Sequence, residues 1–258
     1  MKNLQRWIEL EGAVNVRDLG GLETTDGSAT VHGRILRSDN LQGLTPADIA
    51  TLVETHKVRH VVDLRSTAEV TLEGPGPLTT VPEVTIHHHT LFAEGGRYTD
   101  VEADRVLPWQ DRAADDELRV TGFYYGYLRD RPDSVVRALR VMAHDDGAVI
   151  VHCAAGKDRT GVLCALALTV AGATREAILA DYVATGDRLE RILVRLRASD
   201  TYRRDLDSRP ADDHLPRPSY MEHFLDILDT RFGGPLGWLD AHGWTPDDTT
   251  ALRARLLS

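Results

Sequence analysis

The apolar residues of this chain follow two periods in turn, one typical of strands and one typical of helices. Residues 59–65, 84–89 and 148–152 are short, β-branched stretches that indicate buried strands. Residues 45–57 and 121–144 carry apolar positions at helical spacing. The stretch that follows the last strand, 162–172, is apolar on nearly every face, as in a buried helix. This alternation predicts an α/β fold with a central, mostly parallel sheet flanked by helices.

Capping and turn residues mark the ends of several elements. Thr45, Thr174 and Thr245 each stand directly before a predicted helix, where a hydroxyl can cap the first turn. Glycine turn signals divide residues 17–37 into a small antiparallel element. No internal repeat and no linker rich in Pro, Gly or Ser interrupts the pattern. We therefore expect residues 1–258 to form one domain.

Residues 90–120 are polar and acidic. They hold eight Asp or Glu and four Arg, which is −4 of the net charge of −10. Gly95 and Gly96 could act as a hinge. We predict a helical lid insertion in this region; the alternative is a surface helix with loops.

Composition and charge exclude several classes of protein. With 30 Lys and Arg against 40 Asp and Glu, the chain is not a general nucleic-acid binder that neutralises phosphates. Its two cysteines, Cys153 and Cys164, exclude a disulfide-stapled scaffold. Because it has no apolar run of ~18 residues and its first ten residues lack the apolar core of a signal peptide, we expect a cytoplasmic protein without membrane insertion. The oligomeric state stays open.

The sharpest chemical signal lies between the strand at 148–152 and the buried helix. Its residues are Cys153, Ala154, Ala155, Gly156, Lys157, Asp158, Arg159 and Thr160. A tight loop there wraps backbone N–H groups around an anion at the helix N-terminus. Arg159 offers a planar fork for two phosphate oxygens. Cys153, facing those amides and two cations, should be a thiolate, which is the nucleophilic form.

The pattern HC-x5-RT between strand and helix resembles the cysteine-dependent protein tyrosine phosphatase superfamily. The stretches NVRDLGG at 15–21, GRILRSDNL at 33–41, DLRSTAE at 63–69 and ADYVATGD at 180–187 are similar to its bacterial tyrosine phosphatase B-like branch, and so is the ending GG…WLDAHG. These markers extend over nearly the whole chain. The resemblance implies a tyrosine phosphatase-like α/β fold that acts on phosphotyrosine and phosphoinositides without metal or cofactor.

The resemblance also implies roles for the loop residues. Cys153 would form a thiophosphate intermediate, and Arg159 would bind the phosphate and stabilise its equatorial oxygens together with the amides of residues 154–160. Thr160 resembles the hydroxyl that steadies the departing thiolate. His152 matches the histidine that orients the loop; the alternative is a hydrogen-bonded core histidine.

The general acid departs from the family pattern. In the tyrosine phosphatase B-like branch an aspartate follows the strand that corresponds to 84–89, but HTLFAEGG has none there. Glu94, Asp100 and Asp104 remain as candidates further along. We favour Asp158, as in other phosphoinositide phosphatases with an aspartate before the loop arginine, either as acid or as the residue that orients water. The alternative for Asp158 is a carboxylate that pairs with a nearby cation.

Several other residues receive supporting or structural interpretations. Lys157 resembles a loop lysine of tensin-type phosphoinositide phosphatases. We expect Asp63 and Arg65 to form a structural ion pair near the site, and the helical Asp181 to have a structural role. Three further arginines share one helical face, which we interpret as solvated: Arg188, Arg191 and Arg195. The alternative is a contact surface for an anionic membrane or lipid headgroup.

The histidine run at 87–89 is a weak metal signal. Alternate strand residues point to opposite faces, so only His87 and His89 share a side, and no cysteine nearby completes a ligand set. We expect no metal and no cofactor.

The predicted function is hydrolysis of phosphate monoesters through a phosphorylated Cys153, on phosphotyrosyl protein first and phosphoinositides second. Two alternatives are a dedicated phosphoinositide phosphatase and a non-catalytic module that binds phosphorylated partners. The intact Cys-x5-Arg spacing disfavours the latter, because binding alone does not need the thiol.

Overall fold

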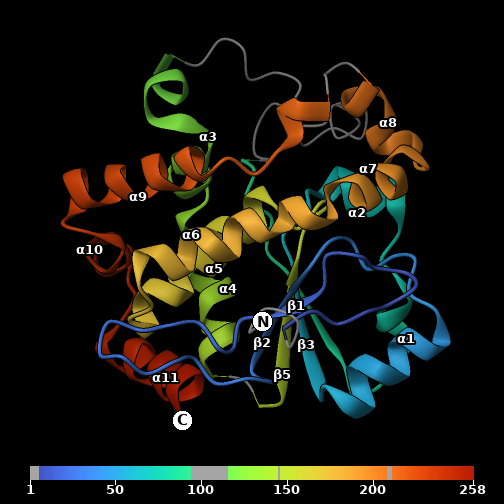
Figure 1. Ribbon diagram of the computed structural model, residues 1–258, viewed down its shortest axis with the longest axis horizontal. Helices are drawn as coiled ribbons and strands as arrows, with labels where there is room; N and C mark the ends of the chain where they lie inside the picture. Colours follow the sequence, from blue (N-terminus) through green and yellow to red (C-terminus); the bar gives the residue numbers. More distant parts are fainter. Residues whose placement is uncertain (1–5, 94–115, 145, 208–210) are drawn as a thin grey trace.

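The computed structural model describes residues 6–93, 116–144, 146–207 and 211–258 (Figure 1). Most of the predicted lid lies outside these ranges, as do its candidate acids Glu94, Asp100 and Asp104. The part of the chain that is described forms an α/β structure, as the alternating pattern predicts.

The sheet has five strands in the order β1-β2-β5-β3-β4. The strands are β1 (Arg17–Asp18), β2 (Ile35–Ser38), β3 (Val58–Asp63), β4 (Thr85–His88) and β5 (Ala148–His152). Only β1 pairs antiparallel, against β2, so the small antiparallel element predicted within 17–37 is present; the other three pairings are parallel. The carboxyl ends of four strands therefore meet at one edge, with β5 in the middle.

Helices cover both faces of the sheet (Figure 1). They are α1 (Pro46–Ala50), α2 (Thr67–Glu73), α3 (Asp116–Asp130), α4 (Pro132–His144), α5 (Asp158–Ala171), α6 (Arg175–Val183), α7 (Leu189–Arg197), α8 (Asp200–Asp207), α9 (Pro218–Phe232), α10 (Pro235–Ala241) and α11 (Pro246–Leu257). The described residues also form one short π-helix, η2 (Thr51–Thr55), and the short 3-10 helices η3 (Pro77–Thr80), η6 (Ala184–Arg188) and η7 (Ala211–His214).

Two apolar clusters divide the core between the faces of the sheet. Alternate residues of β5 enter different clusters, with Val149 and Val151 on the side of α4, α5, α9 and α11, and Ile150 on the side of Leu52. This alternation follows from the strand's two-residue period. A third cluster packs α7 and α8 against Val14 and Ala154, directly beside the Cys153 loop.

The helix predicted over 45–57 is correct only in part. Thr45 caps α1 and accepts from the Asp48 backbone, as expected, but residues 51–55 continue as a π-helical turn. The turn is followed by Lys57, whose φ of +56° stops the helix before β3. The caps predicted at Thr174 and Thr245 are both present. In the described ranges, no helix is both long and apolar enough to cross a membrane.

Candidate active site

The loop that begins with Cys153 lies between the central strand β5 and the helix α5. The parallel register places Asp63 of β3 and Ser38 of β2 on either side of His152, at the same edge of the sheet. Three segments far apart in the sequence therefore meet around the loop.

The carbonyl groups of the loop are held from outside. Asn40 donates its backbone N–H to the Ala154 carbonyl at 2.9 Å. Asn15 Nδ2 donates to the carbonyls of Ala155 and Gly156, at 3.0 and 3.3 Å. Because a planar trans peptide points its N–H opposite to its C=O, these bonds turn the following amides toward the interior of the loop. That is the arrangement an anion requires.

A third donor to the loop comes from a buried charge cluster. Arg37 Nη2 donates to the Gly156 carbonyl at 2.6 Å, and its Nη1 bonds to Asp181 at 2.5 Å. Arg6 and Arg17 also bond to the Asp181 carboxylate, so three guanidiniums share one acid. Burial alone would raise the pKa of Asp181, but the three arginines hold it well below its usual range. Asp181 thus acts on the loop through Arg37, which agrees with the structural role expected for it.

Cys153 is almost completely buried at the end of β5. Thr160, one turn into α5, is fully buried, and its hydroxyl has no hydrogen-bond partner in the described part of the chain. An unpaired buried hydroxyl costs free energy, so such a group is typical of a site that acquires its partner during function.

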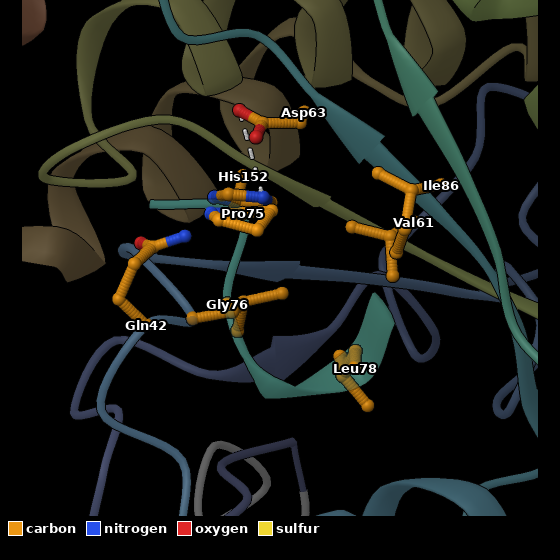
Figure 2. A pocket seen from close by; sticks show the side chains of 9 residues that line it. Gln42, Val61, Asp63, Pro75, Gly76, Leu78, Ile86 and His152 are labelled. Carbon is orange, nitrogen blue, oxygen red and sulfur yellow. Dashed lines mark ion pairs between the residues drawn. The ribbon is translucent and has the colours of Figure 1, made fainter. Parts of the chain in front are cut away.

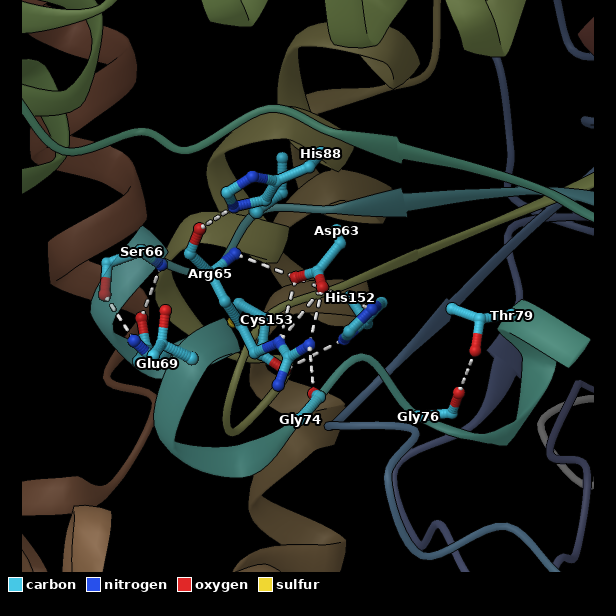
Figure 3. Close-up of polar contacts among 12 residues, drawn as sticks. Asp63, Arg65, Ser66, Glu69, Gly74, Gly76, Thr79, His88, His152 and Cys153 are labelled. Carbon is cyan, nitrogen blue, oxygen red and sulfur yellow. Dashed lines mark hydrogen bonds and ion pairs between the residues drawn. The ribbon is translucent and has the colours of Figure 1, made fainter.

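His152 and the Asp63–Arg65 pair stand behind Cys153 (Figure 3). Arg65 donates to both carboxylate oxygens of Asp63, from Nε at 3.0 Å and from Nη2 at 2.7 Å, so the expected ion pair is present. His152 Nε2 lies 3.6 Å from Asp63, and its Nδ1 lies 3.2 Å from the Cys153 carbonyl. Burial lowers the pKa of His152 below its ordinary value, which favours the neutral ring at pH 7.

Arg159 is paired with a carboxylate that the sequence analysis did not single out. Its Nη1 and Nη2 bond to the two oxygens of Glu69, at 2.5 and 3.0 Å, and its guanidinium lies 4.8 Å from the centre of the Phe92 ring. Burial would lower the pKa of Arg159, but the charge of Glu69 raises it well above its ordinary value. Arg159 is therefore a fixed positive charge at the start of α5.

Glu69 is positioned by the helix that carries it. It is the third residue of α2, where it closes a capping box with Ser66 (Figure 3). Tyr202 of α8 donates to its other oxygen at 3.2 Å. The DLRSTAE stretch contains the capping-box spacing Ser-x-x-Glu, which could have predicted the start of α2, although it could not predict Arg159 as the partner.

Asp158 and Lys157 lie side by side at the mouth of the loop. Lys157 Nζ is 3.6 Å from Asp158 Oδ1 and donates to the His214 carbonyl at 3.0 Å. Asp158 Oδ1 also accepts a hydrogen bond from the hydroxyl of Tyr124 in α3. The aspartate thus has a cation and a phenol as neighbours, and only the cation was anticipated from the sequence.

A small cavity adjoins His152 on the side of the sheet away from α5 (Figure 2). Asp63, Gln42, Leu78 and Ile86 also line it, and it has room for about one water molecule. A phosphorylated side chain does not fit there, so we place the candidate site at the Cys153 loop.

The arginine face predicted around α7 is solvated only in part, because Arg191 is exposed whereas Arg188 and Arg195 are half-buried. Arg195 bonds to Asp39 and to the Gly12 carbonyl, and Asp39 in turn accepts from the Asn15 backbone at 2.9 Å. Arg188 and Arg191 pair with Glu9. Sequence spacing places these arginines on one face correctly, but it carries no information about the N-terminal segment that packs against them.

His87 and His88 lie on β4, whereas His89 follows directly after the strand, which is shorter than the predicted 84–89. His87 Nε2 lies 3.1 Å from His60 Nδ1. Within the described ranges, no group of three or more His, Cys, Asp or Glu could hold a metal ion. The second cysteine, Cys164, is buried in α5 with its pKa raised to about 11 by burial, as a core residue requires.

The chain is similar to several known phosphatases. The chain is 28% identical to the triple specificity protein phosphatase PtpB of Mycobacterium tuberculosis, over 96% of this chain and 98% of PtpB. It is 32% identical to a tyrosine-protein phosphatase of Nostoc commune, over 45% of this chain and 42% of the relative. The solved structure of TpbA from P. aeruginosa covers 73% of this chain and 87% of its own, at 15% identity and a TM-score of 0.31.

A family model described as the tyrosine phosphatase family matches residues 8–258, which include every strand and helix of the structure. The chain belongs to the tyrosine phosphatase family.

Proposed function

We propose that this phosphatase hydrolyses phosphotyrosine through a covalent intermediate on Cys153. The observation that carries the proposal is the loop itself, whose carbonyls are bound from outside by Asn15, Arg37 and Asn40. The amides are thereby turned toward a phosphate that would sit above Cys153, beside the fixed charge of Arg159.

In the first step the Cys153 thiolate attacks phosphorus, an S–P bond forms, and the P–O bond to the tyrosyl oxygen breaks. The phenolate oxygen takes a proton from Asp158, the candidate acid at the loop mouth. In the second step water attacks phosphorus and passes its proton to Asp158. The P–S bond then breaks and the thiolate returns, with the Thr160 hydroxyl available to donate to it.

Phosphoinositides are the second substrate class that we propose. Lys157 adds a cation next to Arg159, and its contact with the His214 carbonyl holds its ammonium group at the loop mouth. A polyanionic inositol headgroup offers additional phosphates to such a charge. The name of PtpB, a triple specificity phosphatase, supports a broad choice of phosphorylated substrates in this family.

The test is metal-free hydrolysis of 4-nitrophenyl phosphate by the wild type, Cys153→Ser and Cys164→Ala. We expect the first variant to lose more than about 10³-fold in kcat, since it removes the nucleophile, and the second to retain activity. Vanadate should inhibit the wild type. If wild type and Cys153→Ser are equally inactive but both bind phosphate, the chain is a binding module and the enzymatic proposal fails.

A second experiment determines which of the two substrates the enzyme prefers. It measures kcat/KM for a phosphotyrosyl peptide and for phosphatidylinositol monophosphates in vesicles under the same conditions. We expect higher kcat/KM for the peptide. A strong preference for the lipid would reverse this order and identify a dedicated phosphoinositide phosphatase.

A further inference from the structure

Two tyrosine hydroxyls form a buried chain that ends on Asp158. The Tyr124 hydroxyl donates to Asp158 Oδ1, and it lies 2.6 Å from the hydroxyl of Tyr182. Tyr124 comes from α3 and Tyr182 from α6, so three helices meet at this contact. Both rings are largely shielded from solvent, with 8% and 1% of their surface exposed.

The direction of the chain follows from proton counting. A phenol has one proton to donate, and a carboxylate can only accept. Because the Tyr124 hydroxyl uses its one proton in the hydrogen bond to Asp158, the Tyr124 oxygen must accept a hydrogen bond from the Tyr182 hydroxyl. Burial raises the pKa of Tyr124 well above its ordinary value, with the charge of Asp158 acting in the same direction, so the phenol stays a donor at every working pH. Each bond in such a chain polarises and strengthens the next.

The surrounding packing keeps the two rings in place. Tyr124 packs edge-on against Tyr182 and Phe224, with ring centres 6.1 and 6.3 Å apart. Tyr182 in turn lies over Gly161 of α5, where an added Cβ would be only 3.0 Å from its ring. The glycine that follows Thr160 therefore allows this tyrosine to approach the start of α5 closely.

The contacts of Asp158 are one-sided. Tyr124 donates a hydrogen bond to Oδ1, and Lys157 forms an ion pair with the same oxygen. Within the described ranges, Oδ2 is therefore the oxygen that can take part in a proton transfer. Asp158 is also the first residue of α5 and about a third exposed, so without Tyr124 its side chain would be held, among the described residues, by the ion pair with Lys157 alone.

We propose that Tyr124 is a positioning residue of this phosphatase: with Tyr182 behind it, it fixes the Asp158 carboxylate so that Oδ2 faces the leaving-group oxygen and, later, the attacking water. This rests on the proposed role of Asp158 in proton transfer. Nothing in the sequence pointed to Tyr124, because it is one of three tyrosines within TGFYYGYLRD and only the fold distinguishes it.

The neighbouring tyrosine, Tyr125, provides a matched control for Tyr124. Tyr125 is the next residue of α3 and is equally buried, but its ring packs against Phe232 and Arg231 at the C-terminal end of α9. Tyr124→Phe and Tyr125→Phe both remove one hydroxyl from a buried ring of α3. Equal thermal midpoints for the two variants would show that a difference in activity does not come from the stability of α3.

The first readout is kcat/KM on aryl phosphates with poor and good leaving groups. A poor leaving group needs the proton from Asp158, whereas a good one departs without it. For Tyr124→Phe we expect a loss of about tenfold on phenyl phosphate, less than about threefold on 2,4-dinitrophenyl phosphate, and an unchanged inhibition constant for vanadate. Tyr125→Phe should stay within about twofold of wild type on both substrates.

The second readout is a double-mutant cycle with Asp158→Asn. If Tyr124 acts through Asp158, then Tyr124→Phe should cause no further loss on phenyl phosphate in the Asp158→Asn background. The same tenfold loss in both backgrounds would overturn the proposal. Failure of the proposed function is a separate outcome: Asp158→Asn alone would then keep full activity on phenyl phosphate.

Discussion

Arg159, the proposed phosphate-binding arginine, already forms an ion pair with a carboxylate of its own chain. Glu69 is completely buried and receives both terminal nitrogens of Arg159, the Ser66 backbone and the Tyr202 hydroxyl. A guanidinium held at two nitrogens keeps one plane, and that plane decides which donors face the substrate. Glu69 is therefore as much a part of the proposed phosphate site as the loop itself, although it lies 90 residues earlier in the chain.

Replacing this carboxylate tests its role. Glu69→Gln keeps the shape of the side chain but sets an amide against a buried guanidinium, so we expect a loss of about 3 kcal/mol in the free energy of unfolding. We also expect at least tenfold lower kcat/KM on 4-nitrophenyl phosphate, because Arg159 loses its fixed plane. Urea unfolding and steady-state kinetics measure the two effects.

Glu73→Gln is the control, because Glu73 lies one turn later on α2 and bonds to Ser199 instead of Arg159. It should change kcat/KM by less than about twofold. An equal loss in both variants would mean that α2 matters only for stability.

At the scale of elements, the backbone of the Cys153 loop approaches the end of strand β2 closely at Gly156. Its φ is +68°, and a Cβ there would lie 2.3 Å from the Ser38 carbonyl oxygen and 2.6 Å from the Ser38 carbonyl carbon. Both are backbone atoms, which cannot rotate away. The same glycine thus has the left-handed conformation and lets the loop approach the end of β2.

Alanine variants of two glycines at the ends of α5 separate these two requirements. Gly172 ends α5 with φ +85°, and an added Cβ would meet only the Thr25 hydroxyl, at 3.8 Å. Gly172→Ala should therefore cost about 1 kcal/mol of stability, from backbone strain alone, and leave activity intact.

Gly156→Ala adds a backbone clash to the same strain, so the loop or β2 must shift. We expect at least a hundredfold loss of kcat on 4-nitrophenyl phosphate, together with weaker vanadate inhibition. Urea unfolding accompanies the kinetics for both variants. Wild-type kinetics in Gly156→Ala would show that the close approach to β2 is dispensable.

The same elements show what the sequence could and could not predict. The strand at 148–152 and the buried helix after it follow from local patterns, and so does the loop between them, because all its residues are contiguous. The partners of the loop follow from strand order. Arg37 reaches it because β2 pairs with β5, and Glu69 because β3 pairs with β5. Asn15 reaches it because it precedes β1, which pairs with β2. Strand order is a long-range property that one sequence does not reveal.

At the scale of the whole molecule, buried carboxylates set the response to acid. For both Asp63 and Asp181, burial would raise the pKa, but cationic neighbours lower it well below its usual range. A carboxyl whose pKa is lower in the folded state contributes stability above its unfolded pKa of about 4, and this is lost as the pH falls through the folded-state value. Burial also lowers the pKa of His152, so keeping this ring neutral costs stability once the pH falls below its unfolded value of about 6.5. We therefore expect the urea midpoint to begin to fall below about pH 6.5 and to fall further below about pH 4.

Asp63→Asn removes one of these groups. It should be less stable than wild type at pH 7, because Arg65 keeps an acceptor but loses the charge, and the two curves should converge toward pH 2. For the control Asp187→Asn, at an exposed position, the plot of urea midpoint against pH should run parallel to that of the wild type. Curves for Asp63→Asn that stay parallel to wild type below pH 4 would exclude Asp63 as a source of the acid response.

Three guanidiniums around Asp181 have a consequence for how the protein responds to its medium. The positive charge of Arg6, Arg17 and Arg37 is buried beside the Cys153 loop, which Arg37 contacts, in a chain whose net charge is −10. Dissolved ions screen exposed charges across about 8 Å at physiological ionic strength, but they do not enter a packed interior. Attraction of a small anion by this cluster should therefore persist in concentrated salt, whereas repulsion by the acidic surface fades. Raising the ionic strength should leave the affinity for inorganic phosphate almost unchanged and should speed the approach of highly charged substrates.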